Sequence, residues 1–268
     1  MVADEELLAA ARQSASAAAT HSRVELRRLV DLDALLEAEA LFSAIWGGDP
    51  VPMAAHLMQA LSASGAYLVG AYERDGSTRG IMLAACVGFW GPPDRPSLHS
   101  HIAGVLAGAR GRDLGFALKL HQRADALAHG VPVVTWTFDP LIARNAHFNL
   151  HKLGGRPVKY AANYYGVMAD AINAGDETDR MVVRWELGGA AARSACDGVD
   201  PPRPAAPGGV VLVDIPGDIE ALRRTDPEQA RTWRRTLRDR LVPLLADGGR
   251  IVDFDRSKNS YRVEVGRS

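Results

Sequence analysis

The 268-residue chain has only two cysteines, Cys86 and Cys196, and they lie far apart in the sequence. Such a pair fits a reducing compartment and predicts neither a disulfide framework nor a zinc site. No apolar run approaches the ~20 residues that a membrane-spanning helix needs. The N-terminus also lacks a basic region followed by an apolar stretch. We therefore expect a cytoplasmic protein with no membrane partner.

The chain also has no excess of charge of either sign, because its formal net charge is -1 at pH 7. This balance gives no electrostatic case for nucleic acid as a partner. The chain contains neither G-x-x-x-x-G-K-[ST] nor G-x-G-x-x-G, which disfavours a nucleotide-binding loop of either type. No cysteine or serine stands beside a plausible base, so we expect chemistry without a covalent enzyme intermediate.

Apolar residues make up 47% of the chain, which is enough to bury a full core. Hydrophobic periodicity and turn residues predict an α/β order of elements. The expected strands cover residues 24–29, 66–72, 80–90, 98–105, 131–138, 163–168 and 181–187. The expected helices cover residues 31–46, a segment ending at 61, 114–129 and a segment from 140 to the glycines at 154–155.

Four regions follow from composition. We expect a flexible tail over residues 1–22, a main domain over 23–187, a Pro/Gly/Ala-rich linker over 188–209 and an extension over 210–268. The extension shows a strand, a helix opened by Asp226-Pro227 and a hairpin. A segment this small is hardly stable alone, so it should pack on the main domain or on a partner subunit.

The most informative stretch is the strand at residues 98–105 with the loop and helix that follow it. The loop at 107–113 is rich in Gly and Arg, and the helix from 114 stops at Gly130. First-turn N–H groups lack intrahelical partners, the helix dipole favours an anion there, and glycine lets the backbone approach closely. The stretch predicts a diphosphate site, although an ordinary strand-to-helix turn would look similar.

The loop Arg110-Gly111-Arg112-Asp113-Leu114-Gly115 resembles the R-x-x-G-x-G/A signature of the GNAT acyltransferases, which hold the pyrophosphate of coenzyme A there. Asp113 stands where that signature has its middle glycine. The order of elements is similar to the GNAT layout as well. The resemblance implies a GNAT-like α/β fold, with a mixed central sheet flanked by helices and a small C-terminal strand-helix-hairpin extension.

The resemblance also implies acetyl-CoA or another acyl-CoA as co-substrate, and no metal. Arg110 and Arg112 would bracket the phosphates, while the Asp113 carboxylate would turn back to cap the helix. Backbone N–H groups of Val105 and Ala107 would hold the thioester carbonyl and the pantetheine. The implied binding residues are Val105, Leu106, Ala107, Arg110, Gly111, Arg112, Asp113, Leu114, Gly115, Phe116 and Asn145.

A proton donor for the leaving thiolate is harder to assign. The segments His99-Ser100-His101, Trp136 to Pro140 and Lys152 to Gly155 resemble an uncharacterised GNAT branch of about this length. Matched through Lys152, the tyrosine that many GNAT enzymes use falls at Leu150, which has no proton to give. Either Tyr164 or Tyr165 replaces it, with Tyr165 preferred, or the chain uses no general acid. A structural role is the alternative for both tyrosines, as half-buried residues of a sheet with the hydroxyl at its edge.

A general base has three candidates. His99 and His101 lie two apart on one strand, so their side chains share a face. An imidazole with a pKa near 6.5 suits removal of a proton from an amine near neutral pH. His101 is preferred because it lies nearer the loop, although a core histidine is the plain alternative. Asp139 competes, but Asp-Pro is equally a turn and helix cap.

Two further patterns favour structural interpretations. His147 and His151 lie four apart on a helix but lack a third ligand at matching spacing, which favours a solvated face over a metal site. The C-terminal helix carries a basic stripe that suggests a solvated face, or less readily an acidic ligand or subunit contact. The stripe consists of Arg231, Arg234, Arg235 and Arg238.

The resemblance implies an acyl-CoA-dependent N-acyltransferase acting on a small-molecule amine, such as an amino acid, with acetyl or succinyl as the acyl group. The alternative is a non-catalytic acyl-CoA-binding or regulatory module, which Asp113 and Leu150 both favour. The acceptor stays open, as does a homodimeric assembly.

Overall fold

The computed structural model describes residues 5–47, 50–74, 80–166, 176–199 and 209–266. By backbone contacts it divides into two compact units, residues 1–135 and 136–268. The first unit holds α1 (Glu5–His21), β1 (Val24–Arg28), α2 (Leu32–Trp46), α3 (Ala55–Ala63), β2 (Tyr67–Glu73), β3 (Met82–Trp90), β4 (Leu98–Val105), a short 3-10 turn η1 (Ala107–Ala109), α4 (Leu114–Ala128) and the start of β5 (Val133–Phe138).

The second unit begins within β5. It continues through α5 (Ala143–Ala146), a π-helical turn η2 (His147–Lys152), β6 (Arg156–Ala161), β7 (Arg180–Glu186), α6 (Ala190–Cys196), β8 (Val210–Asp214), α7 (Ile219–Thr225), α8 (Pro227–Ala246), β9 (Arg250–Asp255) and β10 (Ser260–Glu264).

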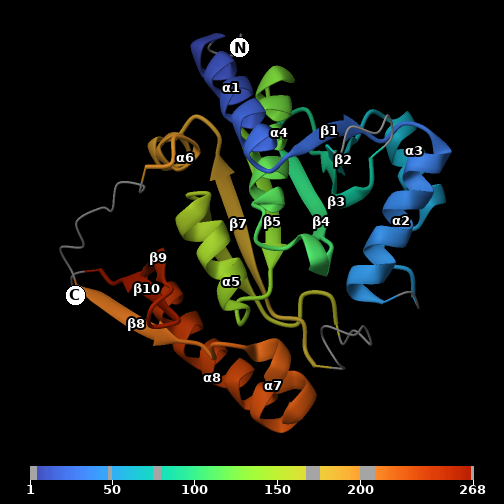
Figure 1. Cartoon of the computed structure of the whole chain (residues 1–268). Helices are drawn as coiled ribbons and strands as arrows, with labels where there is room; N and C mark the ends of the chain where they lie inside the picture. The colour runs from blue at the N-terminus through green and yellow to red at the C-terminus, as the bar shows by residue number, and fades with distance from the viewer. Residues whose placement is uncertain (1–4, 48–49, 75–79, 167–175, 200–208, 267–268) are drawn as a thin grey trace. The chain divides into compact units, whose positions relative to one another are not determined.

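Two sheets organise these elements. Seven strands form a mixed sheet in the order β1-β2-β3-β4-β5-β7-β6, and the last three form a smaller sheet in the order β8-β10-β9 (Figure 1). β1 to β4 are successive antiparallel neighbours, while β4 and β5 run parallel. The expected mixed sheet with flanking helices is therefore confirmed, and so are the strands and helix of the extension.

The core of the first unit lies where α2 and α3 meet the sheet. Asp31 caps α2 by accepting the N–H of Ala34, as its position before the helix predicts. The apolar stripe of α2 then faces β2 and β3, and Leu35, Phe42 and Met58 are fully buried there. Burial of side chains this large contributes roughly 1.5–3 kcal/mol each.

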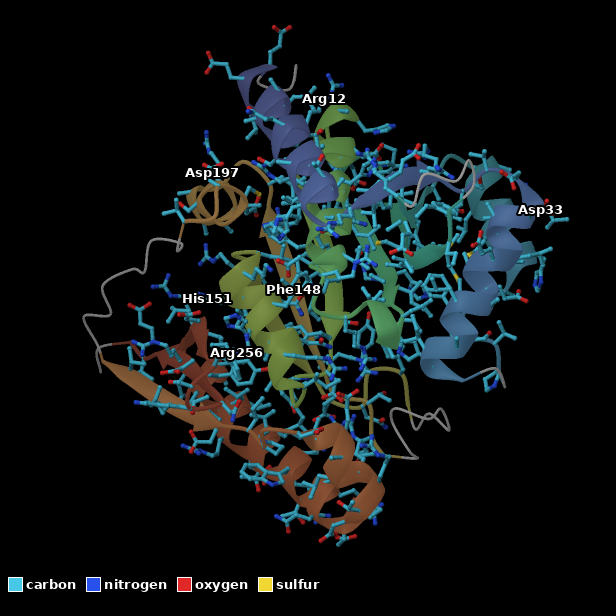
Figure 2. The ribbon with its side chains drawn as sticks, in the orientation of Figure 1. Arg12, Asp33, Phe148, His151, Asp197 and Arg256 are labelled. Carbon is cyan, nitrogen blue, oxygen red and sulfur yellow. The ribbon has the colours of Figure 1, made fainter. Side chains whose placement is uncertain are left out.

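The expected tail at residues 1–22 is wrong over its described part, because Glu5–His21 form α1. Ala11, Ala15 and Ala19 recur every fourth residue and are buried, and α1 lies along α4 (Figure 1). Arg12, labelled in Figure 2, lies on the exposed side of the same helix. Alanine is the best helix former, and its small side chain allows a close approach to a neighbouring helix.

The strand expected at residues 163–168 is also wrong. Asn163 to Gly166 form a turn, with Asn163 at φ 43°, and residues 167–168 lie outside the described residues. The strand in this part of the chain is β6, which comes earlier in the sequence. It was not expected because Pro157 lies within it and proline is unusual inside a strand. β6 tolerates proline because it lies at the edge of the sheet, and its register shifts between Pro157 and Lys159.

Two other expectations need correction. The helix expected from residue 140 begins only at Ala143 and becomes π-helical from His147, although it ends before the predicted glycines. The expected linker contains α6, while residues 200–208 lie outside the described part of the chain. No helix in the described ranges is both long and apolar enough to cross a bilayer.

Candidate active site

His99 and His101 share one face of β4, as the alternation predicts. Both rings pack against Phe89 of β3, with centroids 5.2 Å and 5.7 Å from it, and the two imidazoles are 6.2 Å apart. Burial lowers the pKa of His99, and the neighbouring His101 and Lys119 lower it further. Partial burial lowers the pKa of His101 as well. A lowered pKa favours the neutral imidazole, which is the form that accepts a proton.

A β-bulge sits at His101. Gly88 pairs with Ser100 and Val87 pairs with Ile102, so His101 is the extra residue of β4. A bulge bends its strand and re-aims the side chain it carries, and bulges are common beside active sites. The sequence showed the histidine pair but gave no signal for the bulge.

The pairing of β4 differs between its two sides. Against β3 the pairing runs the length of the strand, from Leu98–Trp90 to Val105–Ala84. Against β5 the described residues pair only at Leu98–Val134 and His99–Thr135. At that last pair, His99 Nδ1 lies 3.3 Å from the Thr135 hydroxyl. Beyond it, the β5-facing edge of β4 has no strand pairing in the described structure.

The loop after β4 is built for close backbone approach. Ala107–Ala109 form η1, and Gly111 adopts φ +84°. A Cβ placed on Gly108 or Gly111 would meet nothing within 4 Å, so the space above the loop is open. The N-terminus of the 15-residue α4 has no side-chain cap. An uncapped N-terminus beside an open glycine loop suits an anion.

The predicted cap by Asp113 is wrong. Asp113 occupies the N-cap position in the left-handed region, at φ 59°, and its side chain makes no capping hydrogen bond. Its backbone carbonyl accepts the N–H groups of Phe116 and Ala117. A φ value of this sign favours glycine, and aspartate is one of the few other residues that tolerate it.

The two loop arginines have different surroundings. Arg110 is exposed, next to the N-terminus of α4. Arg112 donates to Glu73 Oε1 at 2.7 Å and to the carbonyl of Ser22 at 3.3 Å, so its guanidinium ties the loop to the end of β2. Bracketing of a diphosphate by both arginines stays a prediction, with Arg110 the better placed.

The other predicted binding residues divide between the units. Val105 is the last residue of β4, and the N–H of Leu106 donates a hydrogen bond to the carbonyl of Leu83. Leu114 is fully buried, whereas Ala107 is exposed. Gly115 and Phe116 lie half-buried in the first turn of α4. Asn145, Asp139, Leu150 and Tyr165 belong to the second unit.

Asp139 is the buried centre of an ion network in the second unit. Its Oδ2 lies 2.5 Å from Arg223 and 3.4 Å from Arg234, and 4.0 Å from Arg180. Burial opposes its ionisation, but Arg234, Arg223 and Arg180 outweigh that effect and hold the pKa of Asp139 below its ordinary value. Oδ1 accepts the N–H of Leu141. A carboxylate with this many partners is suited to a structural role, and its role as a base stays a prediction.

Tyr165 belongs to a different group in the same unit. Its hydroxyl lies 3.2 Å from Thr137 Oγ1, and the Arg180 guanidinium lies 5.4 Å from its ring centroid. Tyr164 packs edge-on against that ring, and both tyrosines are more than two-fifths exposed. Tyr165 is therefore a partly exposed tyrosine with its hydroxyl beside Thr137, and its role as a proton donor stays a prediction. Leu150 is buried and cannot take that role.

The remaining histidine and arginine patterns resolve into structural contacts. The rings of His147 and His151 stack 4.9 Å apart, and His151, labelled in Figure 2, lies 3.2 Å from Asp253. No group of three or more His, Cys, Asp or Glu side chains in the described ranges could hold a metal ion. The basic stripe of α8 splits, because Arg231 and Arg235 pair with Glu228 at the surface whereas Arg234 and Arg238 pair with buried aspartates.

A buried polar cluster of the first unit has no signal in the sequence. Lys119 of α4 donates to Ser100 Oγ (2.8 Å) and Gln122 Oε1 (3.0 Å), and Gln122 donates to Cys86 Sγ (3.5 Å). Burial lowers the pKa of Lys119 to about 8. The sequence does not reveal this cluster, because α4, β3 and β4 supply its members from distant positions.

Many solved structures are similar to this chain, including the following three. A candidate acetyltransferase of the GNAT family from Desulfovibrio desulfuricans is 18% identical, with 99% of it and 62% of this chain covered and a TM-score of 0.46. Arabidopsis thaliana Naa50, in complex with the bisubstrate analogue CoA-Ac-MVNAL, is 19% identical, with 97% and 60% covered and a TM-score of 0.46. The ribosomal-protein-S18-alanine N-acetyltransferase from Escherichia coli is 15% identical, with 96% and 62% covered and a TM-score of 0.49. At such values the similarity by itself assigns no activity to this chain. No family model and no curated protein sequence matches it.

Proposed function

We propose that the chain is an acyl-CoA-dependent N-acyltransferase that moves an acetyl or succinyl group to the amine of a small molecule, such as an amino acid. The observation that carries the proposal is the course of β4. In the described structure β4 pairs with β5 only as far as His99, bulges at His101, and leads through an open glycine loop to the uncapped N-terminus of α4.

These features suit a long, anionic thioester. The diphosphate of the acyl-CoA would lie on the N-terminus of α4, with Arg110 beside it and glycine at positions 108 and 111 leaving room. The pantetheine arm, a chain of amides, would take hydrogen bonds from the edge of β4 near Val105. The segment from β4 to α4 would then make both kinds of contact. The N-terminus of α4 would bind the charged phosphates, and the edge of β4 would form hydrogen bonds with the pantetheine arm.

The reaction needs a neutral amine, and His101 is the proposed base. The amine nitrogen attacks the thioester carbon, forming the C–N bond while an electron pair moves to the carbonyl oxygen. His101 accepts the amine proton directly or through water, and a backbone N–H of β4 stabilises the oxyanion. Collapse of the intermediate breaks the C–S bond, and the thiolate leaves as free CoA. Water protonates that thiolate unless the chain uses a general acid, for which Tyr165 is the candidate.

His101→Ala tests the proposal. We expect it to abolish thiol release from acetyl-CoA or succinyl-CoA over an amine panel while leaving CoA affinity intact. In the wild type, kcat/KM should fall at acidic pH with a midpoint below ~6.5, because the base works unprotonated and burial lowers its pKa. His56→Ala, at an exposed histidine of α3, is the matched control. If His101→Ala lost CoA affinity as well as turnover, the result would count against His101 as the general base.

A non-catalytic acyl-CoA-binding module is the second candidate. The observation that favours it is Leu150, which is buried where the resemblance implies a proton-donating tyrosine. Thermal-shift titration with acetyl-, succinyl- and free CoA measures binding without turnover, because a ligand raises stability by RT ln(1 + [L]/Kd). Stabilisation by CoA with no turnover of any amine would favour the module.

A further inference from the structure

We infer that Lys119 is a positioning residue for His101, because it holds the Ser100 side of the β-bulge that carries this histidine. The inference rests on the proposed function, in which His101 is the base, and adds a residue that acts on that base through β4. Lys119 lies buried in α4, and no step of the proposed reaction uses it. All the residues concerned belong to the first unit.

The bulge changes which face of the sheet the residues of β4 occupy. On a regular strand, residues two apart lie on the same face. Ser100 and Ile102 do not, because the Ser100 hydroxyl accepts a hydrogen bond from Lys119 of α4 (2.8 Å), whereas Ile102 packs against the core beneath α2 and α3. The extra residue at His101 separates the two, since the register against β3 shifts there.

The neighbouring strand β3 places these contacts on opposite faces of the sheet. Cys86 and Val87 follow one another in β3, so their side chains point to opposite sides. Cys86 Sγ accepts a hydrogen bond from Gln122 of α4 and lies 3.6 Å from Ser100 Oγ, while Val87 belongs to the core with α2. The bulge therefore lies between a polar contact on the α4 face and an apolar contact on the α2 face.

These two contacts together fix the position of the bulge. If β4 regained a regular alternation, either Ser100 would enter the apolar core or Ile102 would face the Lys119 ammonium. In both cases the buried ammonium would lose one of its acceptors, which costs free energy. The hydrogen bond from Lys119 to Ser100 therefore stabilises the register that sets the place of His101.

Two further observations support a clamp at this point. Gly88 of β3 pairs with Ser100, and a Cβ on Gly88 would lie only 2.8 Å from the His99 carbonyl oxygen, so the strands approach closely where the bulge begins. Burial lowers the pKa of Lys119 to about 8, so at pH 7 its side chain is still mostly the ammonium that donates to Ser100.

Lys119→Met and Ser100→Ala each remove the hydrogen bond, and they test the inference at two levels. We expect each variant to lower kcat at pH 7 by about tenfold or more with KM for the acyl-CoA unchanged, since a misplaced base slows the reaction without weakening donor binding. The double variant should be no slower than the slower single variant, because both changes break one contact.

The second level is an NMR pH titration of the histidine ring signals, which needs no turnover. The His101 signal and its titration midpoint should shift in both variants, while those of the exposed His56 stay in place. Ser100→Ala keeps the positive charge of Lys119, so agreement between the two variants separates a change of position from a loss of charge. A shift in Lys119→Met alone would be an effect of charge and would overturn the inference.

Gln122→Met is the matched control within the same cluster. Gln122 is fully buried, accepts the other hydrogen bond of Lys119 (3.0 Å) and donates to Cys86 of β3. Its replacement should lower the free energy of unfolding but leave kcat and the His101 signal unchanged. An equal effect of Gln122→Met on both readouts would indicate a general loss of packing and would overturn the inference.

The outcomes separate this inference from the proposed function. An unchanged His101 signal in Ser100→Ala would make the cluster purely structural and overturn the inference, whatever the activity. A shifted signal with unchanged kcat would count against His101 as the base, and so against the proposed function alone. If the wild type turns over no amine, or if Lys119→Met does not fold, the His101 signal of Ser100→Ala decides, because that variant removes a single hydroxyl.

Discussion

Asp113 shows at the residue scale how a backbone angle outweighs a side chain's usual preference. Aspartate is among the best N-cap residues when its φ lies in the extended region, where the carboxylate reaches the first-turn N–H groups. At φ 59° the chain enters α4 from the left-handed region instead, and the capping hydrogen bond is not made. The same angle explains why a residue other than glycine costs free energy at this position.

We predict that Asp113→Gly leaves the free energy of unfolding unchanged or raises it by up to about 1 kcal/mol, because the left-handed strain is relieved and no side-chain cap is lost. CoA affinity should be kept or improved, since a negative charge leaves the loop. Asp113→Ala removes the same charge but keeps a Cβ at positive φ, so it should be less stable than Asp113→Gly by about 1 kcal/mol. Urea denaturation and CoA titration measure both; weaker CoA binding in both variants would contradict the prediction.

Lys119 makes a second prediction at this scale, because burial lowers its pKa from 10.5 to about 8. Between those pH values the unfolded chain holds the proton and the folded chain does not, so lowering the pH favours unfolding. As the pH is lowered from about 11 to about 7.5, the free energy of unfolding of the wild type should therefore fall by on the order of 3 kcal/mol relative to that of Lys119→Met. Any lost hydrogen bond adds a constant offset, so only the slope is diagnostic. The exposed Lys159→Met should run parallel to the wild type, and a parallel Lys119→Met curve would contradict the assignment.

Among the elements, α1 carries a prediction about its buried alanine stripe. Ala11 is 1% exposed, and Ala10, its neighbour in the sequence, is exposed. Ala11→Asp would bury an unpaired carboxylate between helices, which should lower the free energy of unfolding by several kcal/mol. Ala10→Asp changes the same charge on the solvent side and should cost little. Thermal unfolding of the two variants compares them; equal midpoints would mean that α1 does not pack in solution as described.

The loop between β4 and α4 carries a prediction about phosphate recognition. Arg110→Ala should weaken CoA binding about tenfold or more, with a larger loss at low salt, because an exposed charge acts on phosphates through a screened field. Arg95→Ala, at an exposed arginine outside the loop, is the control. Unchanged CoA affinity in Arg110→Ala would remove this arginine from the site.

At the scale of the folded chain, the Asp139 network joins segments far apart in the sequence. Arg223 and Arg234 come from the C-terminal extension, and the Tyr261 hydroxyl donates to the Pro140 carbonyl at 2.6 Å. The extension thus packs on the segment that follows β5 within the second unit. Removing one partner from such a buried network leaves the others uncompensated, which costs more than the pair contributes when intact.

We therefore predict that Asp139→Asn lowers the free energy of unfolding by about 3–5 kcal/mol, since three guanidinium groups lose their shared carboxylate. The folded-state pKa of Asp139 lies below 3.8, so its contribution is present above that pH and is lost as the pH falls through the folded value. Urea denaturation at pH 7 measures the loss, with the exposed Asp94→Asn as control. A change below 1 kcal/mol would mean that the network is not formed.

The sequence by itself determined the elements whose signals are local. Asp31 and Asp226 cap the helices they precede, and the strand, loop and helix of residues 98–130 form as expected, because caps, turns and helical periodicity act within one or two turns of chain. The histidine pair on one face of β4 follows from the two-residue period of a strand.

Only the tertiary structure decided which of these residues acquire particular surroundings. Arg234 and Arg235 are neighbours in one helix, yet one is buried against Asp139 and Asp176 while the other is exposed beside Glu228. Helical spacing puts Arg234 on the same face as Ala230 and Leu237, but the aspartates that pair with it there come from distant segments. The bulge at His101 has the same origin, since it depends on the register against β3. Partners that lie tens of residues away decide such features, because burial and charge pairing depend on distance in space rather than on distance along the chain.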